Sequence, residues 1–174
     1  FCPKDRWIVT GCGDNTARLW DCRNGEWAMT MHGHQGPVYS SVFSPDGKSI
    51  VTGSFDSMAR VWGLDGRCTQ VLELHNGAVN WAEWSPSGDA IITCSDDGTY
   101  ASWGLKSGTR SQCILTFKEH VAPVYDVSFS PDGRYIVSCG PDCTAKVWDC
   151  ETGRCLTSLE HERHVTASSF SPDG

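Results

Sequence analysis

Residues 34–62 of the chain read HQGPVYSSVFSPDGKSIVTGSFDSMARVW. In this stretch a His, a Thr, an Asp and a Trp follow one another at intervals of 18, four and six residues. The spacing from Ser or Thr to Asp to Trp occurs four times in 174 residues, three times with the His in front. Fixed spacing that recurs in this way indicates a repeat architecture. The four sets are Thr10, Asp14 and Trp20; His34, Thr52, Asp56 and Trp62; His75, Thr93, Asp97 and Trp103; and His120, Ser138, Asp142 and Trp148.

Turn sequences divide the chain at nearly constant intervals. A Ser-Pro-Asp-Gly or Ser-Pro-Ser-Gly turn starts at residues 44, 85, 130 and 171, so successive turns lie 41, 45 and 41 residues apart. Pro presets φ and Gly accepts a positive φ, which is the chemistry of a tight turn. The runs between the turns alternate in period two, as in 38–43. Such runs, bounded by Gly, Asp and Pro, predict β-strands, four to a repeat and with no helix. We therefore predict an all-β fold.

The chain resembles the WD40-repeat β-propeller family, which has a period of 40–45 residues and Gly-His and Trp-Asp marks. Gly33-His34, Trp20-Asp21 and Trp148-Asp149 keep these marks, whereas Trp62-Gly63 and Trp103-Gly104 depart from them. The resemblance implies a WD40-type β-propeller segment of about four four-stranded antiparallel blades, within a seven- or eight-bladed ring. The expected repeat units are approximately 1–34, 35–75, 76–120 and 121–161, with a partial unit at 162–174.

The resemblance also implies that each set of four residues forms a structural tetrad inside one blade. The Asp accepts a hydrogen bond from the His ring, the His bonds the hydroxyl, and the hydroxyl meets the indole N–H of the Trp. The same residue types make a Ser-His-Asp catalytic triad, for which His120, Ser138 and Asp142 are the candidates. An enzyme needs one such site in a cleft. This chain has one set per repeat, each ending on a Trp, which favours the structural interpretation.

The strand count leaves two arrangements open. Sixteen strands are expected, the last over Val165 to Phe170. That strand either closes a four-bladed ring with the first three strands, with His161 completing the set of Thr10, Asp14 and Trp20, or belongs to a larger ring. Propellers have typically four to eight blades, so a four-bladed ring is allowed. WD40-like propellers, however, usually have seven or eight blades, and four blades would turn by about 90° each and repack every interface. We favour a segment of a larger ring, and a contact between His161 and Asp14 would contradict this.

Composition excludes several classes of function. The net charge is −7 without a basic patch, so no direct nucleic-acid partner is expected. No run approaches 18 apolar residues and no targeting segment is visible, so no membrane insertion is expected. The predicted location is intracellular and cytoplasmic, with a nuclear, cytoskeletal or ciliary complex as the alternative.

The ten cysteines occupy repeat-equivalent strand positions, which favours buried structural thiols over disulfides or zinc. There is no Cys-x-x-Cys pair, and no metal or cofactor is predicted. Cys150 and Cys155 flank one hairpin and are the first pair to test as a disulfide.

In the WD40 family the upper face of the ring is the commonest surface for partners. Its side chains stand three and five residues after each His and just before each tetrad Asp. Tyr and Phe are enriched in interface cores and hot spots, and these positions contain no Arg or Lys, which argues against a phosphopeptide. An apolar or mildly basic protein or peptide is the expected partner, with Asp96 as a salt-bridge candidate. The candidate protein-binding residues are Pro37, Tyr39, Phe55, Asn80, Asp96, Pro123, Tyr125, Pro141 and His164.

Two functions follow from these patterns. The favoured one is a non-catalytic scaffold or adaptor, not an enzyme, that binds other proteins or peptides in a multi-subunit complex. The alternative is a ligand-binding or enzymatic propeller that uses its central channel. The innermost strands carry only Glu83 and Asp126 as acids, at non-equivalent positions, which gives the alternative little support. The longer loop at 104–112, with Lys106 and Arg110, is a second candidate surface.

Overall fold

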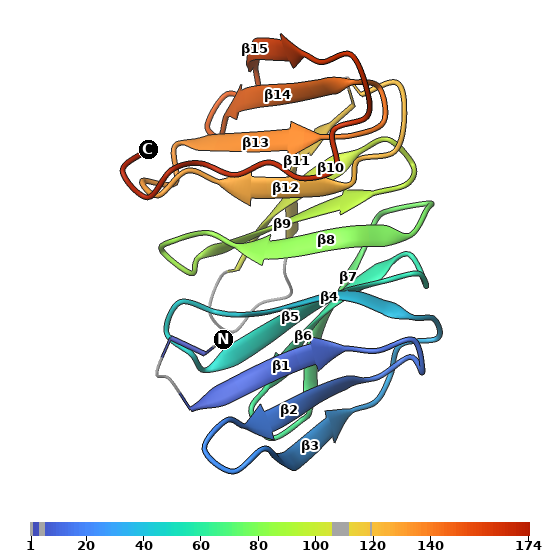
Figure 1. Cartoon of the computed structure of the whole chain (residues 1–174), viewed down its shortest axis with the longest axis vertical. Helices are drawn as coiled ribbons and strands as arrows, with labels where there is room; N and C mark the ends of the chain where they lie inside the picture. Colours follow the sequence, from blue (N-terminus) through green and yellow to red (C-terminus); the bar gives the residue numbers. More distant parts are fainter. Residues whose placement is uncertain (1, 4–5, 106–111, 119) are drawn as a thin grey trace.

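A computed structural model of the chain describes residues 2–3, 6–105, 112–118 and 120–174 (Figure 1). Across these residues the chain forms fifteen β-strands in four antiparallel sheets and no helix. The first sheet contains β1 (Trp7–Gly11), β2 (Ala17–Asp21) and β3 (Glu26–Met31). The others contain β4 (Val38–Phe43), β5 (Ser49–Ser54), β6 (Met58–Gly63) and β7 (Cys68–Glu73); β8 (Val79–Trp84), β9 (Ala90–Ser95), β10 (Tyr100–Gly104) and β11 (Gln112–Phe117); and β12 (Asp126–Phe129), β13 (Tyr135–Cys139), β14 (Thr144–Asp149) and β15 (Cys155–Glu160).

Within each sheet the strands lie in chain order, so consecutive strands pair with each other as antiparallel neighbours. The hairpin that carries the Asp of each set requires one residue with positive φ directly after that Asp. Asn15, Ser57 and Cys143 adopt φ of 70°, 68° and 64° there, and Gly98 adopts 80°. Asn and Gly tolerate this left-handed conformation, whereas Ser and Cys accept it at a cost in energy. The same backbone turn therefore recurs in all four sheets.

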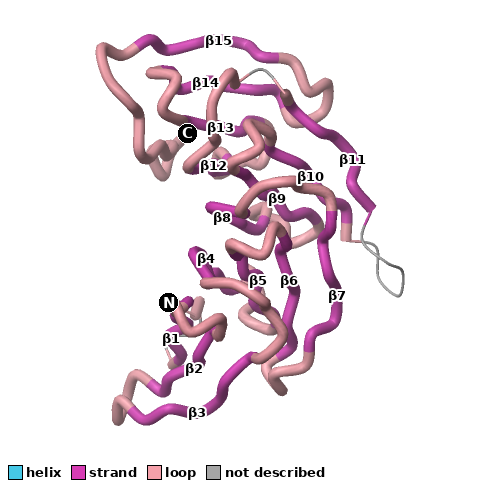
Figure 2. Tube along the Cα trace, turned by 90° about the vertical axis from the view of Figure 1, so that its right-hand side faces the viewer, coloured by secondary structure: helices cyan, strands magenta, loops and turns pink. Residues whose placement is uncertain are grey.

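The four sheets are arranged as a fan that is open on one side (Figure 2). The strands β4, β8 and β12 line its inner side, and β3 and β15 lie at its two opposite ends. The hydrophobic core lies between adjacent sheets, in three clusters of buried residues. Each cluster joins one sheet to the next, so the blades are held by packing between faces as well as by the inner strands.

Each cluster contains one Trp of the repeating sets and an apolar residue from the end of the preceding sheet. Trp62 is grouped with Met31 of β3, Trp103 with Leu72 of β7, and Trp148 with Phe117 of β11. All six side chains are at most 5% exposed. The recurring Trp therefore belongs to the contact between neighbouring blades as well as to its own sheet.

The predicted sixteenth strand is wrong for this structure. Residues 162–174 run beside β12 without strand pairing (Figure 1). Their attachment consists of a hydrogen bond from the Val165 N–H to the Gly140 carbonyl and one from the Ser168 N–H to the Asp126 carboxylate. A β-strand is defined by a ladder of backbone hydrogen bonds to a neighbouring strand. No strand among the described residues pairs with this segment in that way. The described residues thus form an open arc, in which Asp14 pairs with Arg18 and Thr16 and not with His161. In the loop at 104–112, Lys106 and Arg110 lie outside the described residues.

Candidate functional site

The set around His34 forms a continuous hydrogen-bonded network across the second sheet. The His34 Nδ1 lies 2.8 Å from the Asp56 Oδ2, and its Nε2 lies 2.7 Å from the Thr52 Oγ1. The indole N–H of Trp62 donates to the same Thr52 hydroxyl at 2.8 Å. Asp56 also accepts the backbone N–H groups of Gln35 and Met58. The network thus connects the segment before β4 to β5, to β6 and to the turn between them.

The fourth sheet repeats these contacts with Ser in place of Thr. His120 Nδ1 lies 2.7 Å from the Asp142 Oδ2 and its Nε2 lies 2.8 Å from the Ser138 Oγ. This is the connectivity of a catalytic triad. However, Trp148 also donates to the Ser138 Oγ at 2.8 Å, and Ser138 is completely buried. A nucleophile must reach a substrate carbonyl, so this geometry supports a structural role for the three residues.

The network in the third sheet departs from the expected pattern. His75 Nδ1 lies 3.0 Å from the Thr99 Oγ1 and 3.4 Å from the Asp97 Oδ2, and its Nε2 lies 2.7 Å from the Thr93 Oγ1. Thr99 in turn donates to Asp97 at 2.6 Å, while Trp103 donates to Thr93 at 2.9 Å. The direct hydrogen bond expected from His to Asp is thus replaced by a path through the Thr99 hydroxyl.

In the first sheet, Thr10, Asp14 and Trp20 contact no His among the described residues. The Trp20 indole donates to Thr10 at 2.9 Å, as in the other sheets. Asp14 instead pairs with Arg18 and accepts hydrogen bonds from Thr16. Thr10 is exposed, whereas Thr52, Thr93 and Ser138 are fully buried. The site left by the missing His is therefore open to solvent.

Burial and hydrogen bonding displace the pKa values of these networks in a common direction. Burial lowers the pKa of His34 and His75 from 6.5, and the neighbouring carboxylates offset this only in part. For Asp56, Asp97 and Asp142, burial raises the pKa, but the hydrogen bonds that each carboxylate accepts outweigh it, and the pKa is lowered from 3.8. The folded state therefore favours neutral imidazoles beside ionised carboxylates.

These shifts predict that acidification destabilises the protein in two steps. Because the pKa of His34 and His75 is lower in the folded state, the unfolded chain binds more protons below pH 6.5 and stability falls as the pH drops through that range. The carboxylates add a second loss below pH 3.8. Melting temperatures measured between pH 8 and 3 should decline in both windows. In His34→Gln the slope between about pH 6.5 and 5 should be shallower, and an unchanged slope would contradict the assignment.

An exposed aromatic pair lies on the upper face, which we define as the end where β4, β8 and β12 begin and β5, β9 and β13 end. Tyr39 is 50% exposed and Phe55 is 57% exposed. Their ring centroids lie 6.3 Å apart with an interplanar angle of 78°, a T-shaped contact. Two large rings that hold each other in place while facing solvent offer preorganised apolar contact area.

The remaining predicted positions belong to the same face of the second, third and fourth blades and of the segment that follows them. Asn80 donates from its amide to the Asp96 carboxylate at 2.8 Å and to the Val124 carbonyl at 2.9 Å, which positions the exposed Asp96. Tyr125 is 38% exposed. Pro37, Pro123 and Pro141 are partly exposed, and His164 is exposed.

The sequence patterns did not predict one feature of the upper face. A hollow of about 220 Å³ lies between the third and fourth sheets and is lined by Asp96, Asp97, Gly98 and residues 120–123. Val121 at its edge is 92% exposed. The sequence signal that could have indicated this hollow is an apolar residue, Val121, directly after the tetrad residue His120. The hollow combines acidic groups with an apolar rim.

The acids of the inner strands are used in contacts between blades. Glu83 on β8 accepts hydrogen bonds from the Ser128 hydroxyl and the Phe129 N–H of β12. Asp126 on β12 accepts the Ser168 N–H. Burial raises the pKa of both carboxyls. Each acid thus connects one inner strand to the next segment of chain, and no group of three or more metal-ligating side chains occurs in the described part of the chain.

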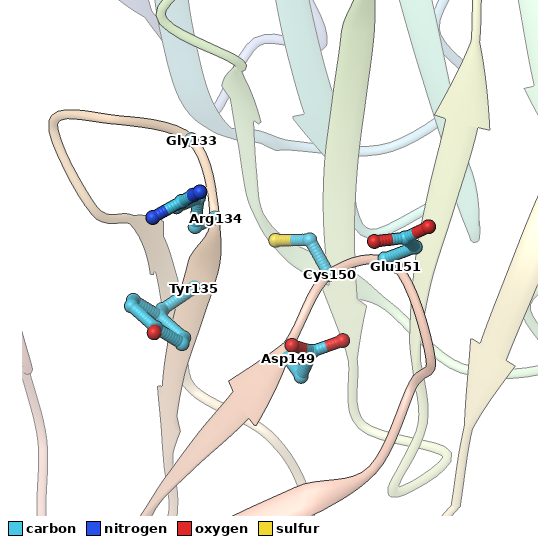
Figure 3. A pocket seen from close by; sticks show the side chains of 6 residues that line it. All are labelled: Gly133, Arg134, Tyr135, Asp149, Cys150 and Glu151. Atoms are coloured by element: carbon cyan, nitrogen blue, oxygen red, sulfur yellow. The ribbon is translucent and has the colours of Figure 1, made fainter.

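Another hollow, with a volume of about 550 Å³, lies at the opposite, lower end of the fourth sheet (Figure 3). Its lining residues are Gly133, Arg134, Tyr135, Asp149, Cys150 and Glu151. Cys150 is the one nucleophilic side chain of this lining, and burial raises its pKa to about 12. A thiol with this pKa stays protonated near neutral pH and is a poor nucleophile. No disulfide joins any of the ten cysteines, Cys150 and Cys155 included.

A family model described as "WD domain, G-beta repeat" matches residues 1–21, 25–63, 66–103 and 111–149. Curated relatives include a guanine nucleotide-binding protein subunit beta of Arabidopsis thaliana, 44% identical over 33% of this chain and 16% of the relative. They also include THO complex subunit 6 of Arabidopsis thaliana, 34% identical over 40% of this chain and 19% of the relative. Nuclear distribution protein nudF 1 of Talaromyces marneffei is 41% identical over 37% of this chain and 14% of its own length.

The matched segments thus span less than a fifth of each of these relatives. No helix in the described ranges is long and apolar enough to cross a membrane. The family match covers most of the chain. Each matched repeat after the first takes the last strand of one sheet and the first three strands of the next, and each repeat ends at or directly after the Trp of one hydrogen-bonded set. The chain belongs to the WD40 repeat family.

Proposed function

We propose that this chain is a non-catalytic scaffold that binds a protein or peptide through the upper face of its second, third and fourth blades. The observation that carries the proposal is the solvent-facing aromatic pair, Tyr39 and Phe55, on the second blade, together with the positioned carboxylate of Asp96 on the same face of the third blade. Two of the relatives, a THO complex subunit and a guanine nucleotide-binding protein subunit beta, are subunits by name, which supports a role within a multi-subunit complex.

The chemistry of the partner follows from the side chains on this face. Tyr39, Phe55 and Tyr125 supply apolar area at low cost in conformational entropy. The hollow beside Asp96 supplies negative charge next to the exposed Val121. None of the predicted upper-face positions carries Arg or Lys. We therefore propose a peptide segment with an aromatic or aliphatic anchor and a Lys or Arg that enters the hollow, rather than a phosphorylated or acidic segment.

Selection from a displayed peptide library tests this proposal. The wild-type chain should enrich peptides that combine a large apolar residue with Lys or Arg. The double variant Tyr39→Ala, Tyr125→Ala should lose binding to the enriched peptides by at least about tenfold, because each ring is an expected hot-spot side chain. Asp96→Asn should keep the apolar preference and lose the preference for a basic residue.

Tyr135→Ala is the matched control, since Tyr135 is also a half-exposed tyrosine, 37% exposed, but lies at the lower end of the fourth sheet. It should bind the selected peptides like the wild type. Retention of every selected peptide by the Tyr39, Tyr125 double variant would refute the site. Equal loss in the Tyr135 variant would show that the effect is not specific to the upper face.

A further inference from the structure

The outer strands of the second, third and fourth sheets each carry a cysteine at the same register position. Cys68, Cys113 and Cys155 each pair with the recurring Trp of their own sheet, next to a shift in the register. Each thiol donates to the carbonyl oxygen of the second residue after it, at 3.3 to 3.5 Å between sulfur and oxygen. Cys68 and Cys113 are exposed, whereas Cys155 is partly buried. Two equivalent thiols are therefore open to reagents in solution.

Cys68 differs from Cys113 by a guanidinium beside its sulfur. The Arg60 Nη1 lies 3.8 Å from the Cys68 Sγ. Arg60 stands on β6 two residues before the recurring Trp, and Ala101 holds the equivalent position in the third sheet. The third sheet therefore presents the same thiol without this guanidinium, which makes Cys113 an internal reference for Cys68.

The guanidinium of Arg60 has no carboxylate partner among the described residues. It donates to two sulfur atoms, the Cys68 Sγ and the Met58 Sδ, each at 3.8 Å, and its Nε is buried without a hydrogen-bond partner. Because sulfur is a weak acceptor and the guanidinium stays charged, its capacity for charge-assisted hydrogen bonds is largely unused. Arg18, at the same position in the first sheet, pairs with Asp14. An Arg that lacks such a carboxylate points to an anionic ligand.

The thiol and the guanidinium lie at the rim of the fan, where the second sheet meets the first. The strand β7, which carries Cys68, lies on the outer side of the fan (Figure 2). A Cβ at Gly33 would lie 3.7 Å from the Arg60 Nη1, so the backbone that leads from the first sheet to the second packs beside the guanidinium. The guanidinium is thus held between this backbone and the exposed thiol. Reactive cysteines occur in electropositive, partly exposed surroundings of this kind.

We propose that Cys68 and Arg60 form a modification site for small disulfides that carry carboxylates, with glutathione disulfide as the representative. Arg60 binds a carboxylate of the reagent and so brings its S–S bond to the Cys68 sulfur. The Cys68 thiol gives its proton to water, and the resulting thiolate attacks one sulfur of the reagent. The S–S bond of the reagent breaks, and its other half leaves as a thiolate that takes up a proton. One mixed disulfide forms and one thiol is released, with the reagent as the oxidant. This site on the rim goes beyond the proposed peptide-binding function.

Site-resolved mass spectrometry of the intact chain tests this site. The protein is treated briefly with glutathione disulfide, the remaining thiols are blocked with N-ethylmaleimide, and the mixed disulfides at Cys68 and Cys113 are quantified in one digest. Arg60→Met removes the charge and keeps an apolar side chain in its place. It should lower the ratio of modification at Cys68 to that at Cys113 by about fivefold, the effect of one exposed ion pair. With hydroxyethyl disulfide, a reagent without charge, the same substitution should leave this ratio nearly unchanged.

Arg67→Met is the matched control for the charge. Arg67 directly precedes Cys68, but its guanidinium lies 3.6 Å from the Asp65 carboxylate, so this variant should keep the wild-type ratio with both reagents. Cys94 is fully buried and should stay unmodified in every folded variant. In the wild type the ratio should be higher with glutathione disulfide than with the uncharged reagent, a comparison that needs no substitution. Equal wild-type ratios for the two reagents, an unchanged ratio in Arg60→Met, an equal fall with both reagents in that variant, or the same fall in Arg67→Met would overturn the site.

Discussion

Replacing Trp148 by Ala should lower the free energy of unfolding by about 4 kcal/mol, within the range for removal of a buried aromatic side chain. Trp148 is 1% exposed, and its ring lies 5.3 Å from Tyr100 and 5.8 Å from Phe117 between ring centroids. Truncation leaves a cavity between the third and fourth sheets. It also removes the indole donor of the Ser138 hydroxyl inside a buried network.

Urea unfolding followed by circular dichroism measures this loss, and Trp27→Ala is the control. Trp27 lies on β3 and is 61% exposed, so its truncation removes the same side chain from a site with little burial. Trp27→Ala should lower the free energy of unfolding by only a small fraction of the amount lost in Trp148→Ala. Similar losses for the two variants would mean that the packing between blades does not depend on the recurring Trp.

The fold was predictable because its main determinants are local. The turn that recurs every 41 to 45 residues is specified by Pro and Gly within four residues, and the strands by the alternation between turns. The prediction of a final strand over 165–170 was wrong for the opposite reason. The alternation of residues in this segment resembles that of β4. A strand, however, also needs the edge of a neighbouring strand to pair with, and such pairing depends on residues far away in the sequence.

Details of the site depended on contacts that spacing does not encode. The fixed intervals brought His34, Thr52, Asp56 and Trp62 together as predicted. The same intervals did not predict the hydroxyl of Thr99 between His75 and Asp97, because shifts of a few tenths of an ångström decide which oxygen the imidazole contacts. The role of Glu83 in joining β8 to β12 likewise required the distance between two inner strands.

Asp142→Ala should destabilise the protein by about 2 to 3 kcal/mol, because it leaves His120 and the turn before β14 without a buried acceptor. The Asp142 side chain is 5% exposed and accepts hydrogen bonds from His120 and from the Thr144 backbone and hydroxyl. Asp14→Ala is the matched control, since Asp14 holds the same repeat position without a His and its side chain is 43% exposed. Urea denaturation should show a much smaller loss for Asp14→Ala, because water can replace most of its contacts. If the two variants lost equal stability, the backbone turn rather than the His contact would explain why Asp recurs there, and the His–Asp bond would contribute little to each blade.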